Sequence, residues 1–182
     1  MPRERWSQYS TVFLRCALGT AFLSAVADRF GVWGAPGQPG VAWGDFAHFQ
    51  IYAAQVNAFL PPPLIPPVAW IATIMEAVLG VMLIVGLCTR AAAVASGGLL
   101  LLFALAMTVS LGVKKPFDYS VFSASAGAFL LAASPVYPWT LEALLPRHAV
   151  GSQRGCHHEP QSNTAFQEQS TEQVRCATTN PL

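Results

Sequence analysis

The sequence predicts an all-α fold: an integral membrane four-helix bundle with an interfacial amphipathic helix between the first and second spans. The 182 residues are 53% hydrophobic and only 10% charged, whereas soluble domains are about one quarter charged. The mean hydropathy is +0.44. Several windows of about 20 residues, the length that crosses a bilayer as a helix, carry few charges or none. This composition excludes a disordered chain and a basic nucleic-acid binder, and no nucleic-acid partner is expected.

Four spans are predicted in one membrane domain, residues 1–146. The second contains a single charged residue, Glu76, and the third contains none. Both are too long for strands and lack the alternation of a half-buried strand. The fourth is free of charge from Tyr119 to Ser134 and is interrupted by Pro135. The predicted spans cover residues 9–30, 66–88, 91–113 and 118–139.

The first span also has a second interpretation. Met1 to Arg5 is basic and Ala25-Val26-Ala27 resembles a signal-peptidase site, which would make this segment a cleaved leader. Arg15 argues against a leader because it breaks the apolar stretch. Lys and Arg residues near the span ends favour a multi-pass membrane protein with both termini cytoplasmic.

The segment between the first two spans is rich in Gly and Pro and contains a predicted helix over residues 45–60. Asp45 is a plausible N-cap. The apolar residues follow a three-four spacing, which predicts one apolar face. Two interpretations remain open: a helix that lies in the membrane interface, and a lid over a lipid-soluble substrate. The residues of the apolar face are Phe46, Phe49, Ala53, Val56 and Leu60.

Residues 147–182 are polar and predict a disordered cytoplasmic tail. The cluster Cys156-His157-His158 lies in this tail, and one such short cluster does not predict a metal site. The four cysteines lack CxxC spacing, and the chain has no Gly-rich phosphate loop. We therefore expect no bound metal and no covalently attached cofactor.

Ionisable residues within spans are costly, so each is a candidate functional group. Glu76 lies near the predicted bilayer midplane, and Arg15 on the first span is its nearest candidate partner. Gly80 and Arg90 follow Glu76 at helical spacing and are expected on the same stripe. The pair either fixes helix register or exchanges a proton with a quinone or another redox partner. Glu76 and Arg15 are therefore the candidate catalytic residues.

Asp28 and Asp118 are both predicted at the outer interface. Each is expected to pair locally, Asp28 with Arg29 and Asp118 with Lys114 or Lys115. The alternative is that both carboxylates line an outer polar mouth above Glu76. On this alternative they join Arg90 as candidate substrate-binding residues.

Several motifs resemble the DoxX family of small bacterial four-span membrane proteins. They are Arg15 with Leu18-Gly19 in the first span, then Glu76, Gly80, Gly86, Thr89 and Arg90, and then the stretch Lys115 to Phe122. The resemblance covers about residues 9–145, and the proline run from Pro61 to Pro67 fits it. It implies a cytoplasmic-membrane bundle related to the membrane subunit of thiosulfate:quinone oxidoreductase. It also carries functional roles over to Arg15, Glu76, Arg90 and Asp118.

The resulting hypothesis is a membrane subunit of a redox system, at most an oxidoreductase subunit, that passes electrons from a sulfur or thiol donor to quinone. Glu76 would exchange the proton and Arg15 would orient it. Quinone would be a substrate, and the partners would be the lipid bilayer, a soluble oxidoreductase, and other subunits of a homo- or hetero-oligomer. The alternative is a non-catalytic membrane scaffold or assembly factor for soluble redox enzymes.

Overall fold

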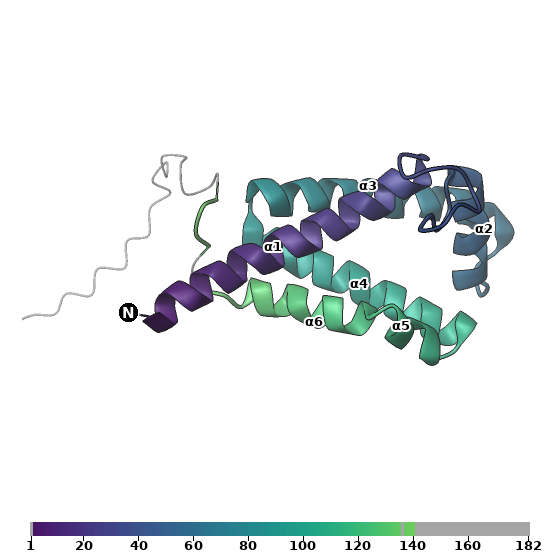
Figure 1. The fold of residues 1–182 in the computed structure, drawn as a ribbon. Helices are drawn as coiled ribbons and strands as arrows, with labels where there is room; N and C mark the ends of the chain where they lie inside the picture. Colours follow the sequence, from purple (N-terminus) through teal and green to yellow (C-terminus); the bar gives the residue numbers. More distant parts are fainter. Residues whose placement is uncertain (1, 136, 141–182) are drawn as a thin grey trace, which may run out of the picture. The chain divides into compact units, whose positions relative to one another are not determined.

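The computed structural model describes residues 2–135 and 137–140, and all regular structure within them is helical. Figure 1 shows the elements in chain order. The prediction of an all-α bundle is confirmed. The predicted tail, residues 147–182, and its Cys-His cluster lie outside the described residues. The elements are α1 (Pro2–Arg29), α2 (Phe46–Val56), the 3-10 turn η1 (Pro62–Leu64), α3 (Ile65–Val85), α4 (Thr89–Leu111), α5 (Lys114–Asp118) and α6 (Val121–Ala132).

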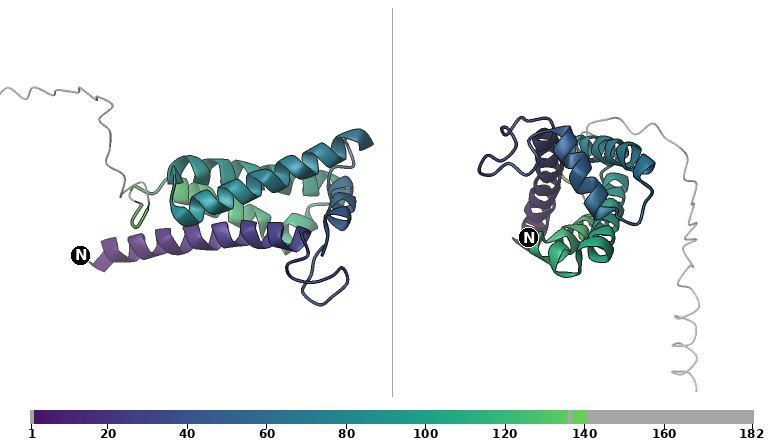
Figure 2. Two further views of the ribbon diagram at one scale, coloured as in Figure 1. Left: turned by 90° about the horizontal axis from the view of Figure 1, so that it is seen from above. Right: turned by 90° about the vertical axis from the view of Figure 1, so that its right-hand side faces the viewer.

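The four longer apolar helices run alternately up and down, and they pack most closely as two pairs, α1 with α3 and α4 with α6 (Figures 1 and 2). The short helix α2 lies across one end of this bundle, which we call the α2 end (Figure 2, right). Three helical stretches of the described chain are long and apolar enough to cross a membrane: Arg5–Arg29, Pro62–Val85 and Thr89–Leu111. This is the arrangement of a multi-pass membrane protein.

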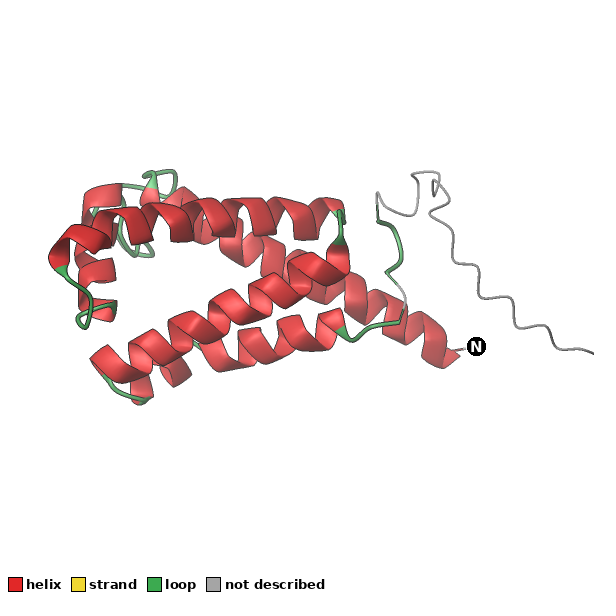
Figure 3. Ribbon diagram, turned by 180° about the vertical axis from the view of Figure 1, so that it is seen from behind, coloured by secondary structure: helices red, strands yellow, loops and turns green. Residues whose placement is uncertain are grey.

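The last predicted span, residues 118–139, differs from the structure. Helix α6 has 12 residues, and at 1.5 Å per residue it is about 18 Å long, shorter than the roughly 30 Å hydrocarbon core. It starts after Ser120, whose φ of 54° lies in the left-handed region, and it ends at Ala132, before Pro135. A fourth apolar helix is therefore present, but it does not cross a bilayer on its own. Figure 3 shows its short course beside α4.

Helix α3 ends before the predicted residue 88 because of Gly86. That glycine has a φ of 77° and caps the helix, with its N–H donating to the Met82 carbonyl at 2.8 Å. Glycine adopts this left-handed conformation without a steric penalty, which makes it the usual residue at a helix C-terminus. Cys88 and Arg90 therefore lie beyond the end of α3.

Small residues set the distance between the paired helices. A Cβ atom added at Gly19 of α1 would lie 2.9 Å from the Gly80 carbonyl oxygen of α3, and one at Gly80 would lie 3.1 Å from that of Gly19. On the other pair, the ring of Phe129 covers Gly97, and the Ser125 hydroxyl donates to the Gly97 carbonyl at 2.8 Å. Close backbone approach at small residues is the usual packing of membrane helices.

Helix α2 joins the two pairs at the α2 end. Its N-cap is Asp45, as predicted, and its buried residues Phe49, Ala53 and Val56 belong to the predicted apolar face. Phe49 and Ala53 pack with Ala69 of α3, whereas Val56 packs against α4. The predicted helix is confirmed, although it ends at Val56 and not at residue 60.

Candidate functional site

Two buried charged side chains of the described chain, one on α1 and one on α3, form an ion pair. Arg29, in the last turn of α1, places its Nη2 atom 2.7 Å from Oε2 of Glu76 on α3. The two side chains are 4% and 3% exposed. An uncompensated charge at this depth would be very unfavourable, so each partner stabilises the ionised form of the other.

Further contacts surround the guanidinium group of Arg29. Its Nη1 donates to the Thr73 hydroxyl at 2.8 Å, and Thr73 in turn donates to the Ala69 carbonyl at 2.8 Å. Its Cζ atom lies 3.8 Å from the ring centre of Phe49 and 5.3 Å from that of Trp43. A cation over aromatic faces is stabilised by their electron density. Arg29 thus connects α1 to α3, to α2 and to the loop that precedes α2.

Arg15 was predicted to be the partner of Glu76, and this is wrong. Its guanidinium is 3% exposed and donates to two backbone carbonyls, those of Pro138 at 3.3 Å and Trp139 at 3.0 Å. Arg15 therefore anchors the segment that follows α6, at the end of the bundle remote from α2. Trp139 also packs edge-on against Tyr9 of α1, with ring centres 6.1 Å apart.

The direction of helical side chains explains this exchange of partners. Gly19 faces Gly80, and since α1 and α3 are antiparallel, Glu76 lies about 6 Å from that contact toward the α2 end. Side chains on a helix tilt toward its N-terminus. Arg29 therefore reaches back along α1 toward Glu76, while Arg15 points away from it.

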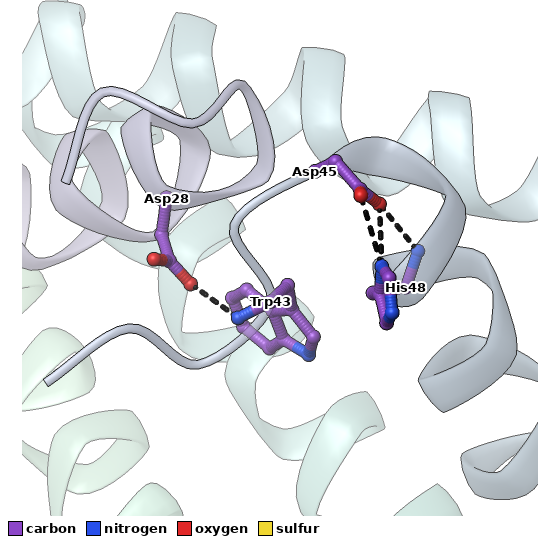
Figure 4. A network of polar contacts seen from close by, with 4 residues as sticks. All are labelled: Asp28, Trp43, Asp45 and His48. Atoms are coloured by element: carbon purple, nitrogen blue, oxygen red, sulfur yellow. Dashed lines mark hydrogen bonds and ion pairs between the residues drawn. The ribbon is translucent and has the colours of Figure 1, made fainter. Parts of the chain in front are cut away.

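Asp28 was predicted to pair with Arg29, and this is also wrong. Its Oδ2 atom accepts the backbone N–H of Trp43 at 2.9 Å (Figure 4) and also that of Ala42 at 3.1 Å. Asp28 is 5% exposed, and Oδ1 has no hydrogen-bond partner among the described residues. The carboxylate thus holds the end of the Gly-rich loop against α1.

A second carboxylate of this region, Asp45, caps α2 (Figure 4). It accepts the backbone N–H of His48 at 2.8 Å and contacts the His48 ring nitrogen Nδ1 at 2.8 Å. The backbone hydrogen bond from His48, followed by the contact with its side chain, lowers the pKa of Asp45 below its ordinary value of 3.8. The cap is strongest when Asp45 is ionised.

The two remaining predicted site residues lie apart from the buried pair. Asp118 forms an ion pair with Lys114 at 2.7 Å, as predicted, and the two side chains are 46% and 84% exposed. Arg90 is exposed in the first turn of α4. It does not continue the stripe of Glu76 and Gly80, because Gly86 ends α3 before it. The predicted site residues therefore do not converge on one site.

Sequence reasoning missed Arg29, which pairs with Glu76, and Thr73, which accepts a hydrogen bond from Arg29. The sequence pattern places Arg29 at the end of the first span, where Asp28 is its expected partner. The signal that could have found it is the N-terminal tilt of helical side chains, which lets a cation at the end of α1 reach an acid within α3. Thr73 lies three residues before Glu76, and therefore on the same face of α3.

This arrangement can fix the position of three elements more readily than it can move a proton. Both ionic partners are enclosed, and the Arg29 guanidinium directs Nη1, Nη2 and its faces to groups of the protein itself, while its Nε has no hydrogen-bond partner among the described residues. Among the residues that the structure describes, no group of three or more His, Cys, Asp or Glu side chains could hold a metal ion.

The chain matches the family described as methylamine utilisation protein MauE over residues 7–118. No curated protein and no solved structure matches it. The predicted DoxX resemblance is wrong, since the match is to a different membrane family. Several residues behind that resemblance serve general helix packing, among them Gly19, Gly80 and Gly86. Because the match spans more than half of its length, the chain belongs to the MauE family of methylamine utilisation proteins.

Proposed function

We propose that this protein is a non-catalytic membrane scaffold or assembly factor for a soluble redox enzyme of methylamine utilisation. The observation that carries the proposal is the enclosed Arg29–Glu76 pair. The acid that a redox subunit would need for proton exchange is bound to a guanidinium, which is itself bound to Thr73 and covered by Phe49. Membership in a family of methylamine utilisation proteins supports the proposal that the scaffold serves methylamine utilisation.

The competing function is that of a redox subunit that passes electrons from a sulfur or thiol donor to quinone. It would require Glu76 to release and take up a proton and Arg15 to orient it. Arg15 instead holds the backbone of residues 138 and 139. This role stabilises the bundle and leaves Glu76 with a different partner, so the scaffold is the better supported of the two functions.

A charge-neutral double variant distinguishes the two functions. Glu76→Gln combined with Arg29→Gln removes the acid without leaving one charge buried alone. We expect a host lacking the chromosomal gene and carrying this variant to grow on methylamine and to accumulate the mature soluble amine-oxidising enzyme. Loss of quinone reduction by its membranes, with the variant protein present at the normal level, would contradict the scaffold and support the redox subunit.

The same host tests the assembly role directly. Deletion of the gene should lower the amount of mature amine-oxidising enzyme while its transcript is unchanged. The soluble enzyme or its precursor should co-purify with the tagged membrane protein. The exposed variant Arg90→Ala serves as the matched control and should support growth like the unchanged protein. A normal level of mature enzyme in the deletion strain would contradict the proposal.

We further propose that the protein lies in the bacterial cytoplasmic membrane with both termini cytoplasmic and with the α2 end outside. Cys88, exposed between α3 and α4, would then face the cytoplasm, and Gln38 in the loop before α2 would face outward. A membrane-impermeant maleimide should label a Gln38→Cys variant in intact spheroplasts and label Cys88 only after lysis. The opposite labelling pattern would contradict this orientation.

A further inference from the structure

A hollow of about 570 Å³ lies between the last turns of α1 and the Gly-rich loop that follows it. Its walls combine one carboxylate, two indole rings and small side chains. Neither Arg29 nor Glu76 lines this hollow, although it adjoins their site through the Trp43 ring, whose centre lies 5.3 Å from Cζ of Arg29. The lining residues that matter here are Asp28, Trp33, Trp43, Ala21, Ala25 and Gly40.

The carboxylate of Asp28 lacks a cationic partner. In the described part of the chain, the basic side chains in ion pairs are Arg29, His48 and Lys114, and each is bound to another acid. Two backbone N–H groups satisfy Oδ2 of Asp28, and Oδ1 has no partner. A buried carboxylate oxygen without a donor is unfavourable, so this atom favours a ligand that supplies positive N–H or N–CH₃ groups.

The indole rings complete a site for such a cation. Trp33 donates its Nε1–H to the Ser24 carbonyl at 3.1 Å, which fixes the ring on α1 and occupies its polar edge. What Trp33 offers a ligand is then its π face, and this residue is 59% exposed. Carboxylates and aromatic faces together are the chemistry that recognises organic ammonium groups. Ala21, Ala25 and Gly40 leave room for one.

The loop gives the ligand a route to Asp28, which is otherwise covered. Gly37 and Gly40 have positive φ angles of 85° and 82°, and a Cβ added at either would meet nothing within 4 Å. Open space therefore lies beside the backbone at both glycines. Binding at Oδ1 requires a shift of the loop beside the hollow, near Gly40, while the N–H of Trp43 stays on Oδ2.

We propose that this hollow binds a small alkylammonium group against Asp28, between Trp33 and Trp43. The inference does not depend on the scaffold function. The same chemistry is carried by a free alkylammonium ion and by the amine headgroup of a phospholipid, and the test separates these two sources.

The test uses the full chain labelled with 5-fluorotryptophan in nanodiscs of phosphatidylglycerol, which has no amine. Five tryptophans give five ¹⁹F signals, assigned by single Trp→Phe variants. Methylammonium or tetramethylammonium chloride should shift the signals of Trp33 and Trp43 saturably, and leave those of Trp70 and Trp139 in place. Equal sodium chloride should not do so. In a separate arm, phosphatidylethanolamine is added to the nanodiscs without free amine. A shift in that arm alone identifies the lipid headgroup as the ligand.

Asp28→Asn is the decisive variant because its amide oxygen can still accept the N–H groups of Ala42 and Trp43. We expect it to weaken ammonium binding by about tenfold or more. Asp118→Asn, which removes an exposed carboxylate elsewhere, should bind normally. A change in the Trp70 and Trp139 signals of Asp28→Asn would show that this variant has an altered fold. In that case Trp33→Leu is used to test ammonium binding, because the exposed Trp33 ring carries no core packing. The inference is overturned by shifts that sodium chloride reproduces, by no saturable shift in either arm, or by full binding in Asp28→Asn or Trp33→Leu.

Discussion

Arg29 and Glu76 form a 2.7 Å ion pair that connects the last turn of α1 to the middle of α3. The two residues are far apart in the sequence, and their side chains are among the least exposed charged groups described. The same guanidinium packs on Phe49 of α2. This contact therefore fixes α1, α2 and α3 relative to one another.

Removing one partner of this pair should destabilise the bundle strongly. We expect Glu76→Gln or Arg29→Gln to lower the free energy of unfolding by about 3 to 5 kcal/mol, because the other charge stays buried without a partner. The double variant should lose clearly less than the sum of the two. Unfolding in mixed micelles followed by far-UV circular dichroism measures all three, and additive losses would contradict the coupling.

Arg15 should control the segment after α6 and leave the α2 end unchanged. In Arg15→Gln, the carbonyls of Pro138 and Trp139 lose their charged donor, so the backbone N–H groups of Trp139 and Thr140 should exchange with solvent faster. Hydrogen exchange read by mass spectrometry measures this, with Arg90→Gln as the exposed control. Faster exchange in α2 and not at residues 139–140 would contradict the hydrogen bonds of Arg15 to the Pro138 and Trp139 carbonyls.

The contact between α1 and α3 should not tolerate a methyl group. A Cβ at Gly19 would lie 2.9 Å from the Gly80 carbonyl oxygen, a backbone atom that cannot move aside alone, so Gly19→Ala should destabilise by about 1 to 3 kcal/mol. Gly98 on α4 is the matched control, since a Cβ there meets nothing within 4 Å. Gly98→Ala should be neutral or slightly stabilising. Equal thermal stability of the two variants would argue against the close approach.

Acidification should release the cap of α2. The pKa of Asp45 is lowered in the folded protein, so the cap contributes stability at pH values above the ordinary value of 3.8, and that contribution is lost as the pH falls through the lowered pKa. The amide proton shift of His48, whose N–H binds Asp45, should report this titration in an NMR spectrum. In Asp45→Asn the acid-dependent shift should vanish. A midpoint above 3.8 in the unchanged protein would contradict the assignment.

Features set by nearby residues could be predicted from the sequence. The long apolar stretches of α1, α3 and α4 and the capping of α2 by Asp45 depend on composition and on spacing within a few residues. The pairing of Asp118 with Lys114 is likewise a contact within one turn. For these features the local pattern and the folded structure agree.

The contacts of Glu76 and Asp28 could not be predicted in the same way. The partner of Glu76 depends on the register of α1 against α3 and on the direction in which each side chain leaves its helix. The partners of Asp28 are backbone N–H groups presented by a loop whose path depends on several left-handed glycines. The short length of α6 follows from the left-handed Ser120 at its start, which no composition pattern marks.

The Arg29 contacts also bear on how the protein is made. Arg29 is synthesised 44 residues before Thr73, and Glu76 emerges later still. Until α3 enters the bilayer, the guanidinium has neither its hydroxyl nor its carboxylate partner and is stable only at the level of the lipid headgroups. Insertion of α3 therefore supplies the carboxylate that pairs with the Arg29 guanidinium, and α1 reaches its final depth only after α3 has inserted.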